Sequence, residues 1–356
     1  NRTKTPTNPR FRIQRFGEPL TQTMKKTTLL AGASALAATL GFSYGQAFTT
    51  PVGYHTETAA GGGAFTVIGV NLVDAPLVSS ALTGVAGATL TDANAPDFTT
   101  ILAEGSDYSI EFANGQHSRI TGNTANTVTT ATELALDADP ANNSYIIRKV
   151  RTLADYFGAD NSAGFLTGSA TEADNIWIPD GEGFKKAYYA EGLPVFLGIT
   201  DGWRLVSTAN EDQAGFGIDF TKGLIVERRG AEALDLTFTG HVKLTPTDVT
   251  ADAGFTYLSR VYPAGSTLGN SGIAETALRG SATDATNIWM PDGAGFKKGY
   301  FAEGLPAFLG ITDGWRLVST ANEDQTDFPL TSGIIVQRNQ DQFDITLTPP
   351  AFYADL

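Results

Sequence analysis

The sequence contains no cysteine in its 356 residues, and it has only three histidines and two methionines. Without thiols, the chain forms no disulfide scaffold, thiolate zinc site, iron–sulfur cluster or cysteine nucleophile. Basic residues are also few, since 24 Lys and Arg stand against 38 Asp and Glu, a formal net charge of −14. Because phosphate binding needs clustered Lys and Arg, this balance argues against nucleic acid as a partner.

Residues that form common catalytic motifs are equally scarce. His55, His117 and His241 do not have the spacing of metal ligands. The G-x-S-x-G match at residues 41–45 lacks the strand–turn–helix context of a nucleophile elbow. The sequence therefore predicts no catalytic residue, and we expect no catalysis.

Long apolar runs are missing except near the amino end. Basic Met24-Lys25-Lys26 precedes an apolar run at 29–42, and small residues follow up to Ala47. This order is typical of a secretory signal peptide, and the run is shorter than the roughly 20 residues that a spanning helix needs. We predict that residues 1–47 are an upstream extension plus signal peptide, cleaved after Ala47, with Met24 as initiator. The mature chain would be exported to the periplasm, cell surface or extracellular space, with no transmembrane helix.

A long internal duplication organises the rest of the chain. Residues 168–213 and 280–325 differ at seven of 46 positions, which leaves 39 identical positions at an offset of 112. Similarity of this length predicts two copies of one structural unit.

The duplication predicts the domain boundaries. We expect a first β-module at 148–240 and a second at 241–356. Residues 48–147 form a separate β region rich in Thr, Gly and Ala, and the sequence leaves open whether it is a diverged module.

Both copies have the pattern of β-strands joined by tight turns. Each copy carries two Asp-Gly pairs, which favour type I′ hairpins, between aromatic and β-branched runs. Residues 234–238 alternate apolar and polar side chains, as a half-buried strand does. The predicted fold is all-β, with tandem small β-sandwich or β-barrel modules after the signal peptide. We expect the lysine pairs Lys185-Lys186 and Lys297-Lys298 on a solvated strand edge, where they discourage edge pairing.

Four short phrases occur along the chain: PVGY at 51–54, RTLADYF at 151–157, ADNI at 173–176 and GLIVER at 223–228. They resemble phrases from a family of uncharacterised exported repeat proteins associated with verrucomicrobial bacteria. The second copy departs from that pattern, with Tyr-Pro-Ala at 262–264 where the Thr-Leu-Ala phrase would stand. The resemblance implies export and a shared architecture, and it supplies no catalytic residues.

The four tryptophans form two equivalent pairs, Trp177 with Trp289 and Trp203 with Trp315. A buried Trp in the core of each module is the favoured interpretation, because aromatic side chains dominate small cores. The alternative is an exposed platform that stacks on sugar rings. Trp203 and Trp315 directly follow Asp-Gly turns, so we expect them to be the more exposed pair.

Acidic residues repeat between the copies and offer two further hypotheses. The repeated acids of the first copy are Asp180, Glu191, Asp201, Glu211 and Asp212. Paired carboxylates are used in glycoside hydrolysis, although Asp before Gly is already explained by turns. Calcium is another use of acids, and its weak candidate ligands are Asp137, Asp139 and Asn142.

Together these features predict an exported, acidic, tandem β-repeat protein with a structural or binding role at the cell envelope or outside the cell. The first alternative is a pair of carbohydrate-binding modules that use Trp platforms. A secreted glycoside hydrolase and an outer-membrane β-barrel are the remaining alternatives. A polysaccharide or an envelope protein is the expected partner, and the sequence does not indicate an oligomeric state.

Overall fold

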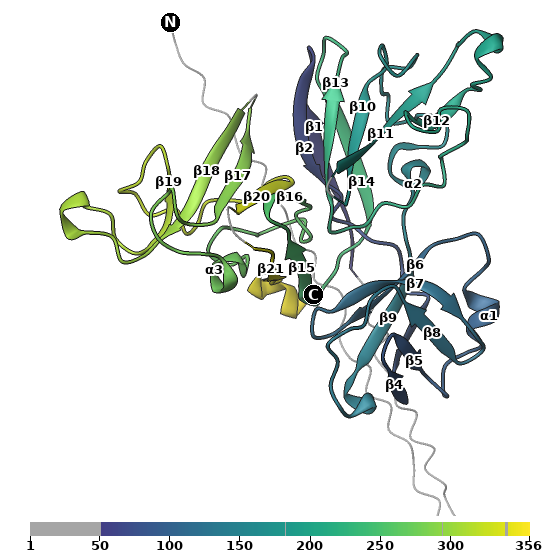
Figure 1. The fold of residues 1–356 in the computed structure, drawn as a ribbon, viewed down its shortest axis with the longest axis horizontal. Coiled ribbons are helices and arrows are strands. Elements are labelled where there is room, and N and C mark those ends of the chain that lie inside the picture. The colour runs from purple at the N-terminus through teal and green to yellow at the C-terminus, as the bar shows by residue number, and fades with distance from the viewer. Residues whose placement is uncertain (1–50, 182, 294, 339–340) are drawn as a thin grey trace, which may run out of the picture. The chain divides into compact units, whose positions relative to one another are not determined.

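The fold was analysed in a computed structural model, which describes residues 51–356 except 182, 294, 339 and 340. The predicted signal peptide at 1–47 lies outside the described residues. The fold is all-β, as predicted, and consists of antiparallel sheets joined by turns and short helices (Figure 1). Within the described ranges, no helix combines the length and apolar character needed to cross a membrane.

The first repeat contains a five-stranded sheet with the order β12–β11–β10–β13–β2. Its strands are β2 (Ala64–Gly69), β10 (Asn175–Asp180), β11 (Gly183–Ala190), β12 (Gly202–Leu205) and β13 (Gly223–Arg228). A two-stranded ribbon of β1 (Val52–Ala59) and β14 (Leu234–His241) completes this unit, which we call module 1.

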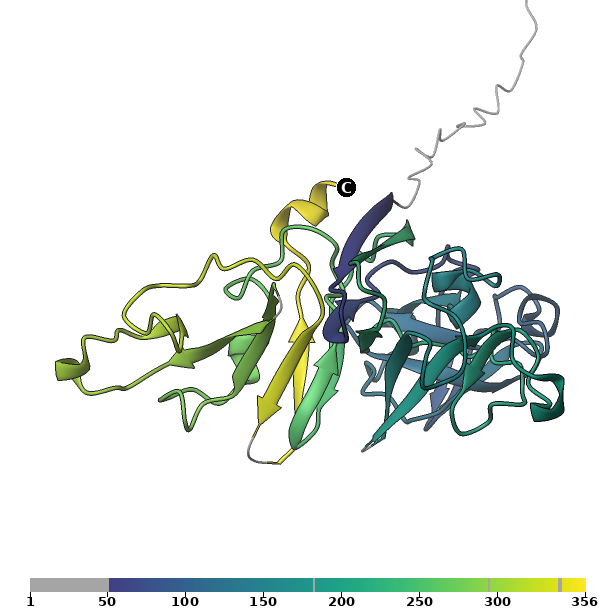
Figure 2. The same cartoon turned by 90° about the horizontal axis from the view of Figure 1, so that it is seen from above.

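The second repeat has the same plan, in the order β16–β20–β17–β18–β19. Its strands are β16 (Gly254–Leu258), β17 (Asn287–Asp292), β18 (Gly295–Ala302), β19 (Gly314–Leu317) and β20 (Ile334–Arg338). A ribbon of β15 (Thr247–Ala251) and β21 (Phe343–Leu347) completes module 2. The chain then ends in the short helix η4 (Ala351–Asp355), beside the C label in Figure 2.

A third sheet is inserted between β2 and β10, and we call it the inserted sheet. Its strand order is β3–β9–β6–β7–β8–β5–β4. The strands are β3 (Val78–Ala81), β4 (Gly84–Ala86), β5 (Thr89–Thr91), β6 (Tyr108–Phe112), β7 (His117–Asn123), β8 (Thr127–Thr130) and β9 (Ser144–Lys149). Its apolar core is separate from that of the modules and includes Leu90, Phe98 and Ile110.

The region at 48–147 therefore has two parts, neither of which is a diverged copy of the whole module. Strands β1 and β2 pair with β14 and β13, so they belong to module 1, and the inserted sheet has a strand order of its own. The boundary predicted at residue 148 falls inside β9 of the inserted sheet. Sequence similarity did not reveal this, because β2 and β16 are short and their apolar residues differ.

The helices are single turns that connect strands. They are α1 (Phe98–Ile101), η1 (Pro140–Asn142), α2 (Leu153–Phe157), η2 (Val195–Leu197), α3 (Ile273–Thr276) and η3 (Ala307–Leu309). Helix α2 starts with a capping box, in which the Thr152 and Asp155 side chains each accept a hydrogen bond from the other's backbone N–H. This cap stabilises the turn that packs Phe157 against Trp203.

Candidate binding surface

Trp203 and Trp315 lie in the core, where each has 1% of its surface exposed. Trp203 packs edge-to-face against Phe165 and Tyr189, and its Nε1 donates to the carbonyl oxygen of Gly158 at 2.7 Å. The prediction that these two are the more exposed tryptophans is therefore wrong. Each tryptophan follows a turn, but it lies in a strand whose residues are covered on both faces. A buried indole cannot stack on a sugar.

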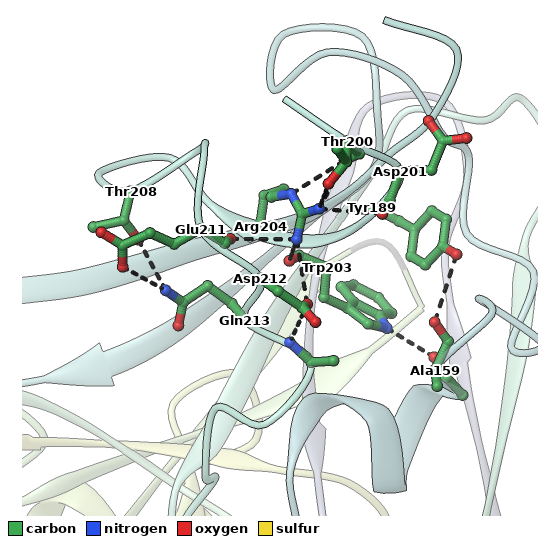
Figure 3. A network of polar contacts seen from close by, with 12 residues as sticks. Ala159, Tyr189, Thr200, Asp201, Trp203, Arg204, Thr208, Glu211, Asp212 and Gln213 are labelled. Carbon is green, nitrogen blue, oxygen red and sulfur yellow. Dashed lines mark hydrogen bonds and ion pairs between the residues drawn. The ribbon is translucent and has the colours of Figure 1, made fainter. Parts of the chain in front are cut away.

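Arg204, the next residue, is almost fully buried and organises the loops around it (Figure 3). Its guanidinium donates to the carbonyl oxygens of Thr200 at 2.8 Å and Trp203 at 2.8 Å, and it lies 3.2 Å from the Asp212 carboxylate. Arg316 repeats the contact to the preceding tryptophan carbonyl and pairs with Asp324 at 3.2 Å. Arg204 therefore has a structural role, because all three of its guanidinium nitrogens donate to acceptors of the chain itself.

The repeated acids are also used locally. Asp180 pairs with Lys185 at 3.0 Å, and an Asp201 oxygen accepts from the backbone N–H of Gly192 at 3.0 Å. Asp212 pairs with Arg204 as described, and Glu211 accepts from its neighbour Gln213 (Figure 3). These contacts explain the carboxylates as parts of turns and surface ion pairs, and they give no support to the hydrolase alternative.

The calcium candidates form a closed loop at η1. Asp139 caps this helix by accepting from the N–H of Ala141 at 3.1 Å, and Asp137 accepts from the N–H of Asp139 at 2.8 Å. Asn142 donates its side-chain amide to Asp137 at 3.3 Å. In the described part of the chain, no group of three or more His, Asp or Glu side chains is arranged to hold a metal ion.

The partly exposed tryptophans are Trp177 and Trp289, which lie on the outer face of each five-stranded sheet. In module 1, Trp177 stands between two exposed rings, Phe65 on β2 and Phe184 on β11. Both neighbours meet it edge-to-face, with ring centroids at 6.2 Å and 6.1 Å. We call these three residues the aromatic face of module 1.

Module 2 repeats this surface. Its aromatic face consists of Trp289 and Phe296, whose rings are 6.5 Å apart, and of Phe255 on β16, two strands from Trp289 in the same sheet. The strand register is the same, because Phe65 lies opposite Glu227 and Phe255 opposite the corresponding Gln337. Phe65 and Phe255 are 55% and 56% exposed, which is unusual for such large apolar rings.

Polar groups surround the Trp177 ring in module 1. Its Nε1 donates to Glu227 at 3.0 Å, and the ammonium of Lys186 lies 4.7 Å from the ring centroid and 3.4 Å from Glu227. Arg229 pairs with the same carboxylate at 2.8 Å. Burial raises the pKa of Glu227, but hydrogen bonds from Arg229 and Trp177 and the charge of Lys186 outweigh it and hold the pKa below its ordinary value.

Module 2 has a different polar group at this position. The Nε1 of Trp289 donates to the amide oxygen of Gln337 at 2.9 Å, and Lys298 lies 5.2 Å from the ring centroid. Gln337 replaces the carboxylate of Glu227, and Lys298 makes no ion pair with any described residue.

Lys186 and Lys298 also correct an expectation about the strand edge. Strands β11 and β18 each have a neighbour on both sides, so the lysine pairs are not on an edge. Lys186 and Lys298 lie over the tryptophan rings, where an ammonium is attracted to the ring face.

The loops between β11 and β12 and between β18 and β19 present a second exposed surface. Phe196 in η2 and Phe308 in η3 are each 86% exposed, and Val195 and the paired Leu197 and Leu309 are exposed beside them. These apolar tips are single-turn helices that project from loops organised by the buried arginines.

A buried ionic cluster joins the inserted sheet to the segment after β14. Glu111 lies 3.2 Å from Arg148 and 3.4 Å from Lys243, and all three side chains are almost fully buried. Burial lowers the pKa values of Arg148 and Lys243, and the charge of Glu111 opposes that effect. The sequence showed no sign of this cluster, because its members lie far apart along the chain.

No family model, curated protein or solved structure matches this chain. The candidate surface therefore has to be interpreted from its own geometry.

Proposed function

We propose that this protein is a non-catalytic, exported binding protein that uses its two aromatic faces to bind polysaccharide. The observation that supports this proposal is a partly exposed Trp that packs edge-to-face on exposed Phe rings in both modules, on Phe65 and Phe184 in module 1 and on Phe296 in module 2. Soluble proteins seldom leave contiguous large aromatics open to water, and such patches commonly mark binding sites.

The chemistry of the faces suits a sugar chain. A pyranose ring has apolar C–H surfaces that pack on aromatic rings, and its hydroxyl groups need nearby donors and acceptors. Lys186 and Glu227 supply such groups beside Trp177, and Lys298 and Gln337 supply them beside Trp289. A few polar groups around an apolar surface provide orientation and specificity. Two equivalent faces on one chain would also gain avidity for a polymer.

Affinity electrophoresis of the full chain in gels that contain neutral polysaccharides tests the proposal. We expect at least one neutral β-glucan to retard the wild-type chain. The double variant Phe65→Ser/Phe255→Ser should lose that retardation and remain folded, because both rings are largely exposed. The double variant Trp177→Ala/Trp289→Ala should also lose it.

The matched control is Phe196→Ser/Phe308→Ser, which removes exposed rings outside the aromatic faces. Its retardation should equal that of the wild type. Unchanged migration of the wild type across the whole panel, or equal losses in the control and test variants, would overturn the proposal.

A structural role at the cell envelope is the second candidate, and the exposed apolar tips support it. Tips such as Phe196 and Phe308 can dock on another surface in an assembly. Sedimentation velocity over a concentration series distinguishes this candidate. Concentration-dependent association that Phe196→Ser/Phe308→Ser removes would support it, and a single species of unchanged mass would contradict it.

A further inference from the structure

The two aromatic faces keep the same rings but differ in their ionic groups. In module 1, Lys186 and Arg229 share the carboxylate of Glu227, at 3.4 Å and 2.8 Å. Both oxygens of Glu227 are therefore occupied by donors from its own chain. A ligand anion at this position would compete with the Glu227 carboxylate for Lys186 and Arg229.

Module 2 has lost that carboxylate and kept the lysine. Gln337 uses its amide oxygen to accept from Trp289, so its amide nitrogen is left as a donor toward a ligand. Lys298 lies over the same ring without an ion-pair partner among the described residues. The face thus combines an ammonium and an amide N–H with exposed rings, which is a donor set suited to an anion.

A second difference between the two copies also removes an acid from module 2. In module 1, Arg228 pairs with the buried Asp174. The corresponding residues of module 2 are Arg338 and Thr286, and Arg338 lies 4.0 Å from the Phe343 ring centroid, with no hydrogen-bond partner at its Nε or at one terminal nitrogen. Module 2 has therefore lost two acids that pair with cations in module 1, and its sequence also has Asn339 where module 1 has Arg229.

We infer that the aromatic face of module 2 binds acidic polysaccharide, in which Lys298 and the Gln337 amide contact the carboxylate or sulfate groups, whereas the face of module 1 is restricted to neutral chains. This inference rests on the proposed polysaccharide-binding function and adds the ligand class of each face. The anion supplies the counter-charge that Glu227 supplies in module 1. A charge-assisted hydrogen bond of this kind is stronger than one between neutral groups.

The test exchanges the residue that accepts the hydrogen bond of the exposed tryptophan in each face. The probes are polygalacturonate as the acidic polysaccharide and a neutral β-glucan, each used in affinity electrophoresis with the full chain. We expect Gln337→Glu to weaken retardation by polygalacturonate about tenfold, which corresponds to about 1.4 kcal/mol. Retardation by the neutral chain should fall far less, because the intact face of module 1 still binds it. Lys298→Gln should have the same effect, and Lys186→Gln, the matched control, should not.

The reciprocal variant makes the test sharper. Glu227→Gln should increase affinity for polygalacturonate, because it removes the carboxylate that pairs with Lys186 and Arg229. Retardation by polygalacturonate should also fall as salt is raised, because ionic contacts at the surface are screened.

The outcomes separate this inference from the function on which it rests. Retardation by neither polysaccharide would overturn both. Retardation by the neutral chain, with polygalacturonate binding absent or insensitive to Gln337→Glu, would overturn only the inference. Polygalacturonate binding that survives Phe255→Ser would also overturn it, because the contact would then lie away from the aromatic face.

Discussion

The indole nitrogen of Trp203 donates to the carbonyl oxygen of Gly158 at 2.7 Å, whereas that of the equivalent Trp315 is buried without a partner among the described residues. The two tryptophans otherwise occupy the same place in the two modules. We therefore expect Trp203→Phe to lower the free energy of unfolding by about 0.5–1.5 kcal/mol more than Trp315→Phe, because it removes a hydrogen bond of a buried donor that Trp315 does not make. Urea unfolding followed by circular dichroism measures the difference, and equal losses would contradict it.

The buried Arg204 supports a second prediction. Arg204→Met should lower the free energy of unfolding by about 1–3 kcal/mol, because it leaves the carbonyls of Thr200 and Asp201 without their donor. The matched control is Asp212→Asn, which weakens the exposed end of the same contact and should cost about 1 kcal/mol or less. Thermal unfolding of both variants gives the comparison, and similar losses would argue against the central role of the guanidinium.

A third prediction concerns the ionic cluster of Glu111, Arg148 and Lys243. Glu111→Gln removes the carboxylate between two buried cations, so we expect a loss of about 3–5 kcal/mol in the free energy of unfolding. Lys185→Gln breaks an exposed pair with Asp180 and a cation–π contact with the Phe216 ring, and it should cost about 1 kcal/mol or less. Chemical denaturation tests this, and a Glu111→Gln protein as stable as the wild type would refute it.

Stability should also fall in acid. Burial raises the pKa of Asp92 and of Asp155, but hydrogen bonds involving Ser80 and Thr152 respectively help to bring each pKa below its ordinary value of 3.8. Because the folded carboxylates bind protons more weakly than the unfolded ones, their stabilisation is complete above pH 3.8 and is lost as the pH falls below it. Melting temperatures measured between pH 7 and pH 2 should show a decline in that acidic range. Asp155→Asn should reduce the decline.

Substitutions in the exposed apolar tips should leave the stability of the protein almost unchanged. Phe196→Ser and Phe308→Ser should change the free energy of unfolding by no more than about 0.5 kcal/mol, because the two rings contact little of their own chain. Differential scanning calorimetry of each variant checks this. A clear fall in melting temperature would mean that the tips pack against the protein in solution.

The sequence was sufficient for the all-β class because the Asp-Gly turns and the short β-branched runs are local signals. It was insufficient for the exposure of the tryptophans. Trp203 follows a turn, yet its burial is decided by α2 and the loop at Phe165, which are distant in the sequence. Periodicity within a four-residue strand cannot report what covers each side.

The aromatic faces were also beyond the sequence, for a related reason. Phe65 contacts Trp177 only because β2 pairs with β13, and the strands of the inserted sheet separate these two strands in the sequence. A signal was present in retrospect, since Phe-Thr precedes an apolar pair at Phe65 and again at Phe255. The register between paired strands was needed to place Phe65 and Phe255 on the same face of the sheet as a tryptophan.

The inserted sheet has a consequence for the order in which the modules form. Val52 pairs with His241 in module 1, whereas Thr247 pairs with Leu347 in module 2, so the outer ribbon of module 1 closes a loop nearly twice as long. Closing a longer loop costs more chain entropy, and pairings distant in sequence form slowly. The ribbon of module 2 would therefore form sooner once synthesised. The ribbon of module 1 would form later, because β1 and β14 can pair only after the long segment between them, which includes the inserted sheet, has become compact. Two units that share most of their residues in the duplicated block would thus differ in folding rate.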